Sequence, residues 1–257
     1  MDFASEFDWH KAPFNSFAFA LTTSLIYLFS CIVHYAVYGS NPQELFIWKI
    51  LKGFIPMHNL ILCFGSLIMF IGIFREVVLR SFADGSVEWL LCESETTQPI
   101  GTLWFWSYIY YLSKYYELLD TLLQLARGKY PPHSFLHAYH HGGVILMSWV
   151  WIDTAATMQF VGSLFNTLVH VLMYYYFYLK TQNIEPKWKS LLTSFQIIQF
   201  LISLVCFIIT MYLVNGLGRK CKGMPSVYGS ILFNVTLLYG FFNVLHSTPK
   251  VKRTKDH

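Results

Sequence analysis

The chain has 257 residues, of which 55% are hydrophobic and 12% are charged, and its formal net charge is +4. Soluble proteins carry about 25% charged residues, so this composition excludes an ordinary soluble domain and favours a membrane protein. At roughly 20 apolar residues per membrane-spanning helix, the length allows about seven helices and little else. We therefore expect one all-α, polytopic membrane domain that covers residues 1–257.

Seven apolar runs follow one another along the chain. They lie at about residues 17–38, 59–79, 101–126, 137–152, 156–179, 188–215 and 226–246. By length and composition these runs predict seven transmembrane helices. The fourth run is the shortest and begins at a cluster of histidines, so we expect its first turn to lie near the membrane surface.

The distribution of lysine and arginine in the loops predicts the orientation, because cytosolic loops carry an excess of both. If the N-terminus lies outside the cytosol, the loops and tail on the cytosolic side hold more of these residues than the other side. We expect a lumenal segment of about 16 residues at the N-terminus and a cytosolic tail of about ten. The basic cluster GRKCK at residues 218–222 argues the other way.

The five cysteines include no CxxC pair and no metal-ligand spacing, so zinc is not expected. The predicted topology places Cys92 and Cys221 in two loops on the non-cytosolic side, where an oxidising lumen permits a disulfide, and we predict that they form one. Two free thiols in unrelated loops are the alternative. The other three cysteines lie in apolar runs and are interpreted as packing residues.

The third and fourth runs carry polar side chains on one face of each predicted helix. Residues three or four apart share a face, so KYYELLDT aligns Lys114, Glu117 and Asp120. The same spacing in HAYHH aligns three histidines, namely His137, His140 and His141. An isolated charge at a helix centre costs about 2.5–3.5 kcal/mol on insertion scales, so these groups should face partners or a wet cavity.

The fifth and sixth runs repeat this pattern. NTLVHVLMYYYF places Asn166, His170 and Tyr174 on one face, and TSFQIIQ places Gln196 and Gln199 three residues apart. We expect the four polar faces to meet around one enclosed cavity. Simpler interpretations compete with this one. The glutamines can be interhelical hydrogen-bond partners, and the lysine and glutamate of the third run can form a neutralising ion pair. The tyrosines can be ordinary aromatic residues at the membrane interface.

The HxxHH spacing is also used by membrane di-iron desaturases and hydroxylases, which resemble one another in carrying about eight histidine ligands. Here only His137, His140, His141 and His170 are expected to converge, which is too few for two irons. A single metal on three or four of them is one alternative, and with it a metal-dependent lipid desaturase or hydroxylase. The other is acid-base and covalent chemistry by the imidazoles themselves, with a carboxylate of the third run orienting a ring.

Four motifs closely resemble those of the ELO family of very-long-chain fatty acid elongases, in the same order and spacing: KYYELLDT, HAYHH, NTLVHVLMYYY and TSFQIIQ. The resemblance covers about residues 17–244, and it departs at Phe177, where the family pattern usually has a second tyrosine after Tyr176. It implies a 3-oxoacyl-CoA synthase of the endoplasmic reticulum that condenses a long acyl-CoA with malonyl-CoA and releases CO2. It also implies seven transmembrane helices, six of them forming an inverted barrel around a closed-ended acyl tunnel, with no metal and no other bound cofactor.

The same resemblance assigns roles to the polar residues. It implies that His140 is the nucleophile that forms an acyl-imidazole and that His170 assists from across the chamber. His137 and His141 would shape and polarise the site. A supporting group completes the expected catalytic residues: Lys114, Glu117, Asp120 and Asn166.

Substrate contacts are expected at two places. In the chamber they would come from Tyr174, Gln196 and Gln199. At the cytosolic mouth, basic residues would meet the CoA phosphates, although topology and anionic lipid headgroups explain such residues equally well. These residues are Arg127, Lys129, Lys180, Lys187 and Lys189.

Two further features of the sequence bear on location and substrate. The C-terminal RTKDH resembles a retrieval signal to the endoplasmic reticulum, and Pro132, five residues before the first box histidine, favours saturated or monounsaturated chains over polyunsaturated ones. Expected partners are acyl-CoA, malonyl-CoA, membrane lipids and the reductases and dehydratase of the elongation cycle, with a homodimer as an option and no nucleic acid. A seven-helix receptor or lipid carrier is the non-enzymatic alternative.

Overall fold

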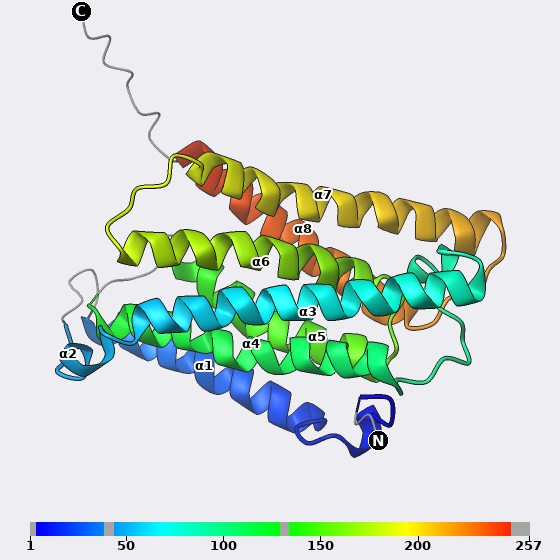
Figure 1. Ribbon diagram of the computed structural model, residues 1–257, viewed down its shortest axis with the longest axis horizontal. Coiled ribbons are helices and arrows are strands. Elements are labelled where there is room, and N and C mark those ends of the chain that lie inside the picture. The colour runs from blue at the N-terminus through cyan, green and yellow to red at the C-terminus, as the bar shows by residue number, and fades with distance from the viewer. Residues whose placement is uncertain (1–3, 39–43, 129–133, 248–257) are drawn as a thin grey trace, which may run out of the picture.

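The computed structural model describes residues 4–38, 44–128 and 134–247, the last four of them without side chains. Within those ranges the chain is helical, with one isolated bridge between Asp8 and Ile100 and no β-strand. Its long helices run side by side along the long axis of the molecule (Figure 1). They are α1 (Phe17–Tyr38), α3 (Ile55–Asp84), α4 (Thr102–Ala126), α5 (Ser134–Asp153), α6 (Gln159–Thr181), α7 (Lys189–Met211) and α8 (Met224–Ser247). Shorter elements are η1 (Trp9–Lys11), α2 (Trp48–Leu51), η2 (Glu88–Leu90) and the π turn η3 (Tyr212–Gly216).

Each predicted apolar run coincides with one long helix, so the runs are confirmed as helices. The helix ends follow from local signals. α3 begins before the predicted run 59–79, with Pro56 in its first turn. Backbone N–H groups in the first turn have no partner within the helix, so proline loses no hydrogen bond there. It ends at Gly85, whose φ of 63° is the left-handed conformation that glycine adopts at helix C-termini.

Five of the long helices are long and apolar enough to cross a membrane: α1, α3, α6, α7 with η3, and α8. α4 and α5 fall outside this class, although they have 25 and 20 residues, because charged residues interrupt α4 and histidines interrupt α5. The spanning helices expose large apolar side chains, such as Phe29 at 67% and Leu232 at 68%. Such surfaces suit lipid, and the protein is a multi-pass membrane protein.

The helix contacts follow a closed order. α3 packs on α4, α4 on α5, α5 on α8, α8 on α7, α7 on α6 and α6 on α3, while α1 packs on α5. Close approach of α8 to α5 depends on Gly143, because a Cβ at this position would lie 2.6 Å from the Phe233 ring. The helix that carries the histidines is thus held between α4 and α8.

One end of the molecule, here called the disulfide end, has its loops tied together. Cys92, between η2 and α4, is bonded to Cys221, which precedes α8. Glu93, 2% exposed, accepts hydrogen bonds of 2.6 and 2.7 Å from Arg80 of α3. The Lys222 N–H donates to the Glu93 carbonyl at 2.9 Å. These contacts hold two loops across the helix ends.

The opposite end, at the left of Figure 1, carries α2, the C-terminal end of α6 and the N-terminal end of α7. We call it the basic end, because four of the predicted CoA-binding cations are exposed there: Arg127, Lys180, Lys187 and Lys189. Pro132, Lys129 and the basic tail at 250–255 lie outside the described residues.

Candidate active site

An elongated cavity lies among α5, α6, α7 and α8, with one side chain of α4 in its wall. α5 borders the cavity with a stripe at helical spacing that begins at His140, passes Val144 and Met147 and ends at Trp151. At 1.5 Å per residue, this stripe is about 16 Å long. Most of the lining is apolar, and the polar lining residues are Tyr110, His140, Thr157, Gln159, Asn166, Gln199, Ser203, Ser230 and Asn234.

The three histidines of α5 diverge. His140 borders the cavity and meets the His141 ring edge to face, with 5.2 Å between ring centres. His137 turns toward α4, where its Nε2 lies 2.9 Å from Thr121 Oγ1, and that hydroxyl lies 2.8 Å from the Tyr27 hydroxyl. The expectation that all three share one cavity is therefore corrected: of the three, only His140 lines it.

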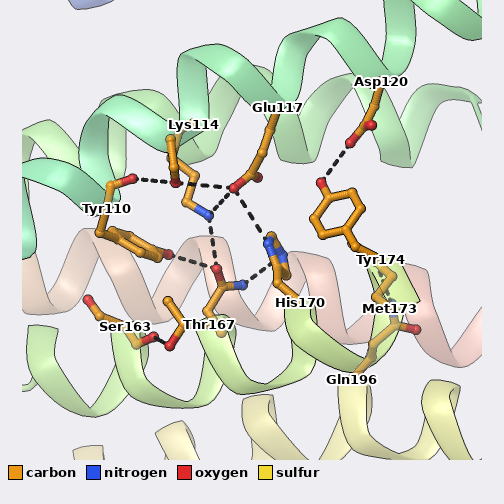
Figure 2. A network of polar contacts seen from close by, with 12 residues as sticks. Tyr110, Lys114, Glu117, Asp120, Ser163, Thr167, His170, Met173, Tyr174 and Gln196 are labelled. Atoms are coloured by element: carbon orange, nitrogen blue, oxygen red, sulfur yellow. Dashed lines mark hydrogen bonds and ion pairs between the residues drawn. The ribbon is translucent and has the colours of Figure 1, made fainter. Parts of the chain in front are cut away.

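Lys114 and Glu117 form a buried ion pair on α4 (Figure 2). Lys114 Nζ lies 2.7 Å from Glu117 Oε1, and both side chains are 1% exposed. Nζ also donates to Asn166 Oδ1 at 3.0 Å and lies 4.2 Å from the centre of the Tyr110 ring. The Tyr110 hydroxyl donates to the same Asn166 oxygen at 3.0 Å. Each charge therefore has a close partner, which buried ions require.

This network fixes the form of His170. Because Asn166 Oδ1 accepts from two donors, its Nδ2 must be the donor toward His170 Nε2, 3.3 Å away. The ring proton is then assigned to Nδ1, which lies 3.5 Å from Glu117 Oε1. Both nitrogens of His170 thus face protein groups, as Figure 2 shows. Asn166 lines the cavity, so the network reaches the cavity wall.

Asp120 belongs to a different network. Its carboxylate accepts from the Tyr174 hydroxyl at 2.7 Å and lies 2.8 Å from His58 Nε2 of α3. Neither Asp120 nor Tyr174 lines the cavity. The direct hydrogen-bond partners of Asp120 are thus His58 and Tyr174 rather than a histidine of α5, and the expectation that Tyr174 contacts substrate stays a prediction. Sequence reasoning missed His58. Its only signal is a polar residue just before the apolar run 59–79, and pairing it needs the alignment of α3 with α4.

The two glutamines of α7 also separate. Gln199 lines the cavity. Gln196 is half-buried outside it, and its Nε2 lies 3.7 Å from Met173 Sδ of α6. In this geometry Gln196 is an interhelical hydrogen-bond partner between α6 and α7, which is the simpler interpretation that the sequence allowed, whereas Gln199 borders the cavity.

The cations at the basic end differ in how far they are engaged. The Arg127 guanidinium lies 5.7 Å from the centre of the Trp48 ring, and Lys180 pairs with Glu185. Lys187 and Lys189 are exposed. Lys129, the fifth predicted cation, lies outside the described residues.

The divergence of the histidines also bears on the metal alternative. In the part of the chain that the structure describes, no three His, Cys, Asp or Glu side chains are placed to share one metal ion. The reason is that His137 is directed to α4, while His170 is held between Asn166 and Glu117.

Comparison with known proteins gives one consistent result. The model of the ELO family, described as GNS1/SUR4, matches residues 12–257. Fatty acid elongase sre1 of Dictyostelium discoideum is 33% identical, over 93% of this chain and 88% of its own length. Fatty acid elongase A of the same organism is 35% identical over 77% and 70%, and very long chain fatty acid elongase 2 of Mus musculus is 28% identical over 80% and 68%. The match over nearly the whole chain shows that the protein belongs to the GNS1/SUR4 (ELO) family.

Proposed function

We propose that the protein is a condensing enzyme of fatty acid elongation. It joins a long acyl-CoA to malonyl-CoA and forms a 3-oxoacyl-CoA, CO2 and free CoA. Two observations support the proposal: similar proteins carry the name fatty acid elongase, and His140 borders an elongated, mostly apolar cavity. The position of His140 is the observation that carries the proposal.

In this proposal the cavity is the acyl slot of a barrel. The closed order of contacts supports an inverted barrel built of α3 to α8, with α1 as the seventh span. His140 lies six residues into α5, toward the basic end, so an acyl chain attached there extends toward the disulfide end. A disulfide needs an oxidising compartment, which supports a lumenal disulfide end and a basic end that faces the cytosol. The membrane is then that of the endoplasmic reticulum.

The first half of the reaction moves the acyl group to His140. A neutral His140 nitrogen attacks the thioester carbonyl, the carbon–sulfur bond breaks, and the CoA thiolate takes the imidazole proton and leaves as CoA. An acyl-imidazole remains, with its chain in the apolar slot. A water-excluded chamber protects this hydrolysable intermediate.

The second half forms the carbon–carbon bond. Malonyl-CoA loses CO2, and its enolate carbon attacks the acyl-imidazole carbonyl. The carbon–nitrogen bond breaks, the leaving imidazolate of His140 takes up one proton that originates from solvent, and 3-oxoacyl-CoA leaves. His170 assists from the network that Asn166 connects to the cavity wall, and the Lys114–Glu117 pair holds that network. His137 and His141 shape and polarise the site: the His141 ring packs against the rings of both His137 and His140.

The remaining parts of the proposal concern binding and location. Both carbon units arrive as CoA thioesters, so no bound cofactor is needed. Exposed Lys187 and Lys189, with Arg127 and Lys180, are placed to meet CoA phosphates at the basic end. The substrates are saturated or monounsaturated chains, and the product passes to the reductases and dehydratase of the elongation cycle.

The test gives the purified protein a long acyl-CoA without malonyl-CoA. We expect release of free CoA and one acyl group on His140, seen by peptide mass mapping, and neither product in His140→Ala. His10→Ala, an exposed histidine near the N-terminus, is the matched control and should behave as the wild type. An undiminished adduct in His140→Ala, or none in the wild type, would contradict the assignment.

A further inference from the structure

The turn between α5 and α6 forms the floor of the cavity at the disulfide end. Two polar residues of this turn, Thr157 and Gln159, line the cavity and are 3% and 2% exposed. Above them the wall is apolar and aromatic, with Trp151, Phe165 and Val227 among its residues. The far end of a mostly apolar slot therefore carries two buried polar side chains.

The Gln159 amide has a donor that the protein does not use. Its Nε2 is buried and has no hydrogen-bond partner among the described residues. Buried side-chain donors are nearly always paired in folded proteins, because an unpaired one loses its hydration without compensation. Gln159 also lines the cavity, which makes a ligand in the cavity the candidate acceptor.

Thr157 supplies a second donor beside the first. Its Oγ1 accepts the Glu93 N–H at 3.0 Å. A hydroxyl that accepts in this way still has its own proton to give, and no described residue accepts that proton. The floor thus holds two donors, an amide N–H and a hydroxyl two residues apart in sequence, whose protons no described residue accepts.

The turn that carries these donors is held in an uncommon backbone conformation. Ala155 and Met158 have φ of 46° and 69°, which non-glycine residues adopt at a cost and seldom without a reason in the surrounding structure. The Thr157 N–H donates to the Lys222 carbonyl and the Met158 N–H to the Leu90 carbonyl, both at 3.1 Å. Loops of the disulfide end therefore fix the floor before any ligand binds.

We propose that this floor binds a hydroxyl group carried near the far end of the acyl chain. A hydroxyl oxygen has two lone pairs, one for each donor, and its proton also lets it satisfy the Gln159 amide in the flipped orientation. An unsubstituted chain that reached the floor would displace water and leave both donors against methylene groups. The inference rests on the proposed function and names its substrate class: saturated acyl-CoA with a hydroxyl at or near the terminal carbon.

The structure also sets the chain length. Gly162 of α6 faces Trp151, since a Cβ there would lie 3.0 Å from that ring. Gln159, three residues before Gly162, is about 4–5 Å farther along the slot, which places the floor about 20 Å from His140. At about 1.2 Å of reach per bond in an extended chain, this corresponds to roughly 16 carbons.

The experiment compares two substrates in the full-length protein with malonyl-CoA present. Hexadecanoyl-CoA and 16-hydroxyhexadecanoyl-CoA are each assayed for kcat/KM, together with the matching pairs of 14 and 18 carbons. For the pair that reaches the floor, we expect the wild type to favour the hydroxylated chain by about 5- to 100-fold, the effect of leaving a buried donor unpaired. Gln159→Met, which keeps the size and loses the donor, should lose most of this preference. Gln98→Met, the same change at an exposed site in a loop of the disulfide end, should keep it.

Each outcome decides the proposal. Equal rates for both chains at every length would mean that water alone satisfies the amide, and an unchanged preference in Gln159→Met would place the hydroxyl elsewhere. Because the readout is a ratio within one variant, a partly unstable variant still gives an answer. If no acyl-CoA is condensed at all, the proposed function fails. Thermal unfolding with each acyl-CoA then tests the floor alone: stronger stabilisation by the hydroxylated chain, lost in Gln159→Met, supports it, and equal stabilisation overturns it.

Discussion

The buried pair of Lys114 and Glu117 gives the sharpest prediction about stability. Both side chains are 1% exposed and their charged atoms are 2.7 Å apart. Replacing Glu117 by leucine leaves the lysine ammonium buried with neutral partners only, namely the Asn166 carbonyl and the Tyr110 ring. Removing one partner of a buried ion pair costs about 3–5 kcal/mol, because the other charge loses its compensation. We expect Glu117→Leu to lower the free energy of unfolding by about this amount.

The double variant separates the charge from the packing. Replacing Lys114 by methionine and Glu117 by leucine together removes both charges and keeps similar volume. Apolar replacements of whole buried pairs are often neutral, so the double variant should be more stable than either single one. The coupling energy of the cycle should reach at least about 2 kcal/mol, within the range found for residues in contact.

The assay is equilibrium unfolding of the purified protein in mixed detergent micelles with increasing SDS, followed by tryptophan fluorescence. Glu185→Leu is a control on the same chemistry, because Glu185 and its partner Lys180 have side chains that are 78% and 39% exposed, and exposed pairs contribute at most about 1 kcal/mol. The reasoning is refuted if Glu117→Leu unfolds like the wild type, or if the double variant loses as much as the two single variants together.

Two further predictions concern the disulfide end. Arg80→Met leaves Glu93, 2% exposed, without its cation and should lower the free energy of unfolding by about 3–5 kcal/mol. Arg219→Met removes a cation from an exposed pair with Glu88 and should change it by less than about 1 kcal/mol. Equal effects of the two variants in the same SDS titration would contradict the importance of the buried pair. The disulfide links Cys92 and Cys221, which are 129 residues apart in sequence, and so restricts the unfolded chain. Reducing it should lower the melting temperature of the wild type but not that of Cys92→Ser. A reductant that shifts both equally would show that the bridge is not the cause.

The sequence determined the helices and most of the site's composition. Apolar runs long enough for a membrane form helices because lipid offers no partner for free backbone groups, and each predicted run is a helix here. The spacing of Lys114 and Glu117 allowed an ion pair as one of two interpretations, since residues three apart share a face, and the structure has that pair. The sequence also predicted a bridge between Cys92 and Cys221, with two free thiols as the alternative, and the structure has that bridge.

Only the tertiary structure decided which polar groups meet. His137 and His140 are three residues apart and so point about 60° apart around the helix axis, which is enough to send one toward Thr121 of α4 and the other into the cavity. Asp120 finds His58 because α3 lies beside α4. Helical periodicity fixes a residue's direction relative to its own axis, but the rotation of that axis against its neighbours is set by packing of the whole bundle. The unpaired amide of Gln159, which depends on loops more than sixty residues away in sequence, is therefore visible only in the folded protein.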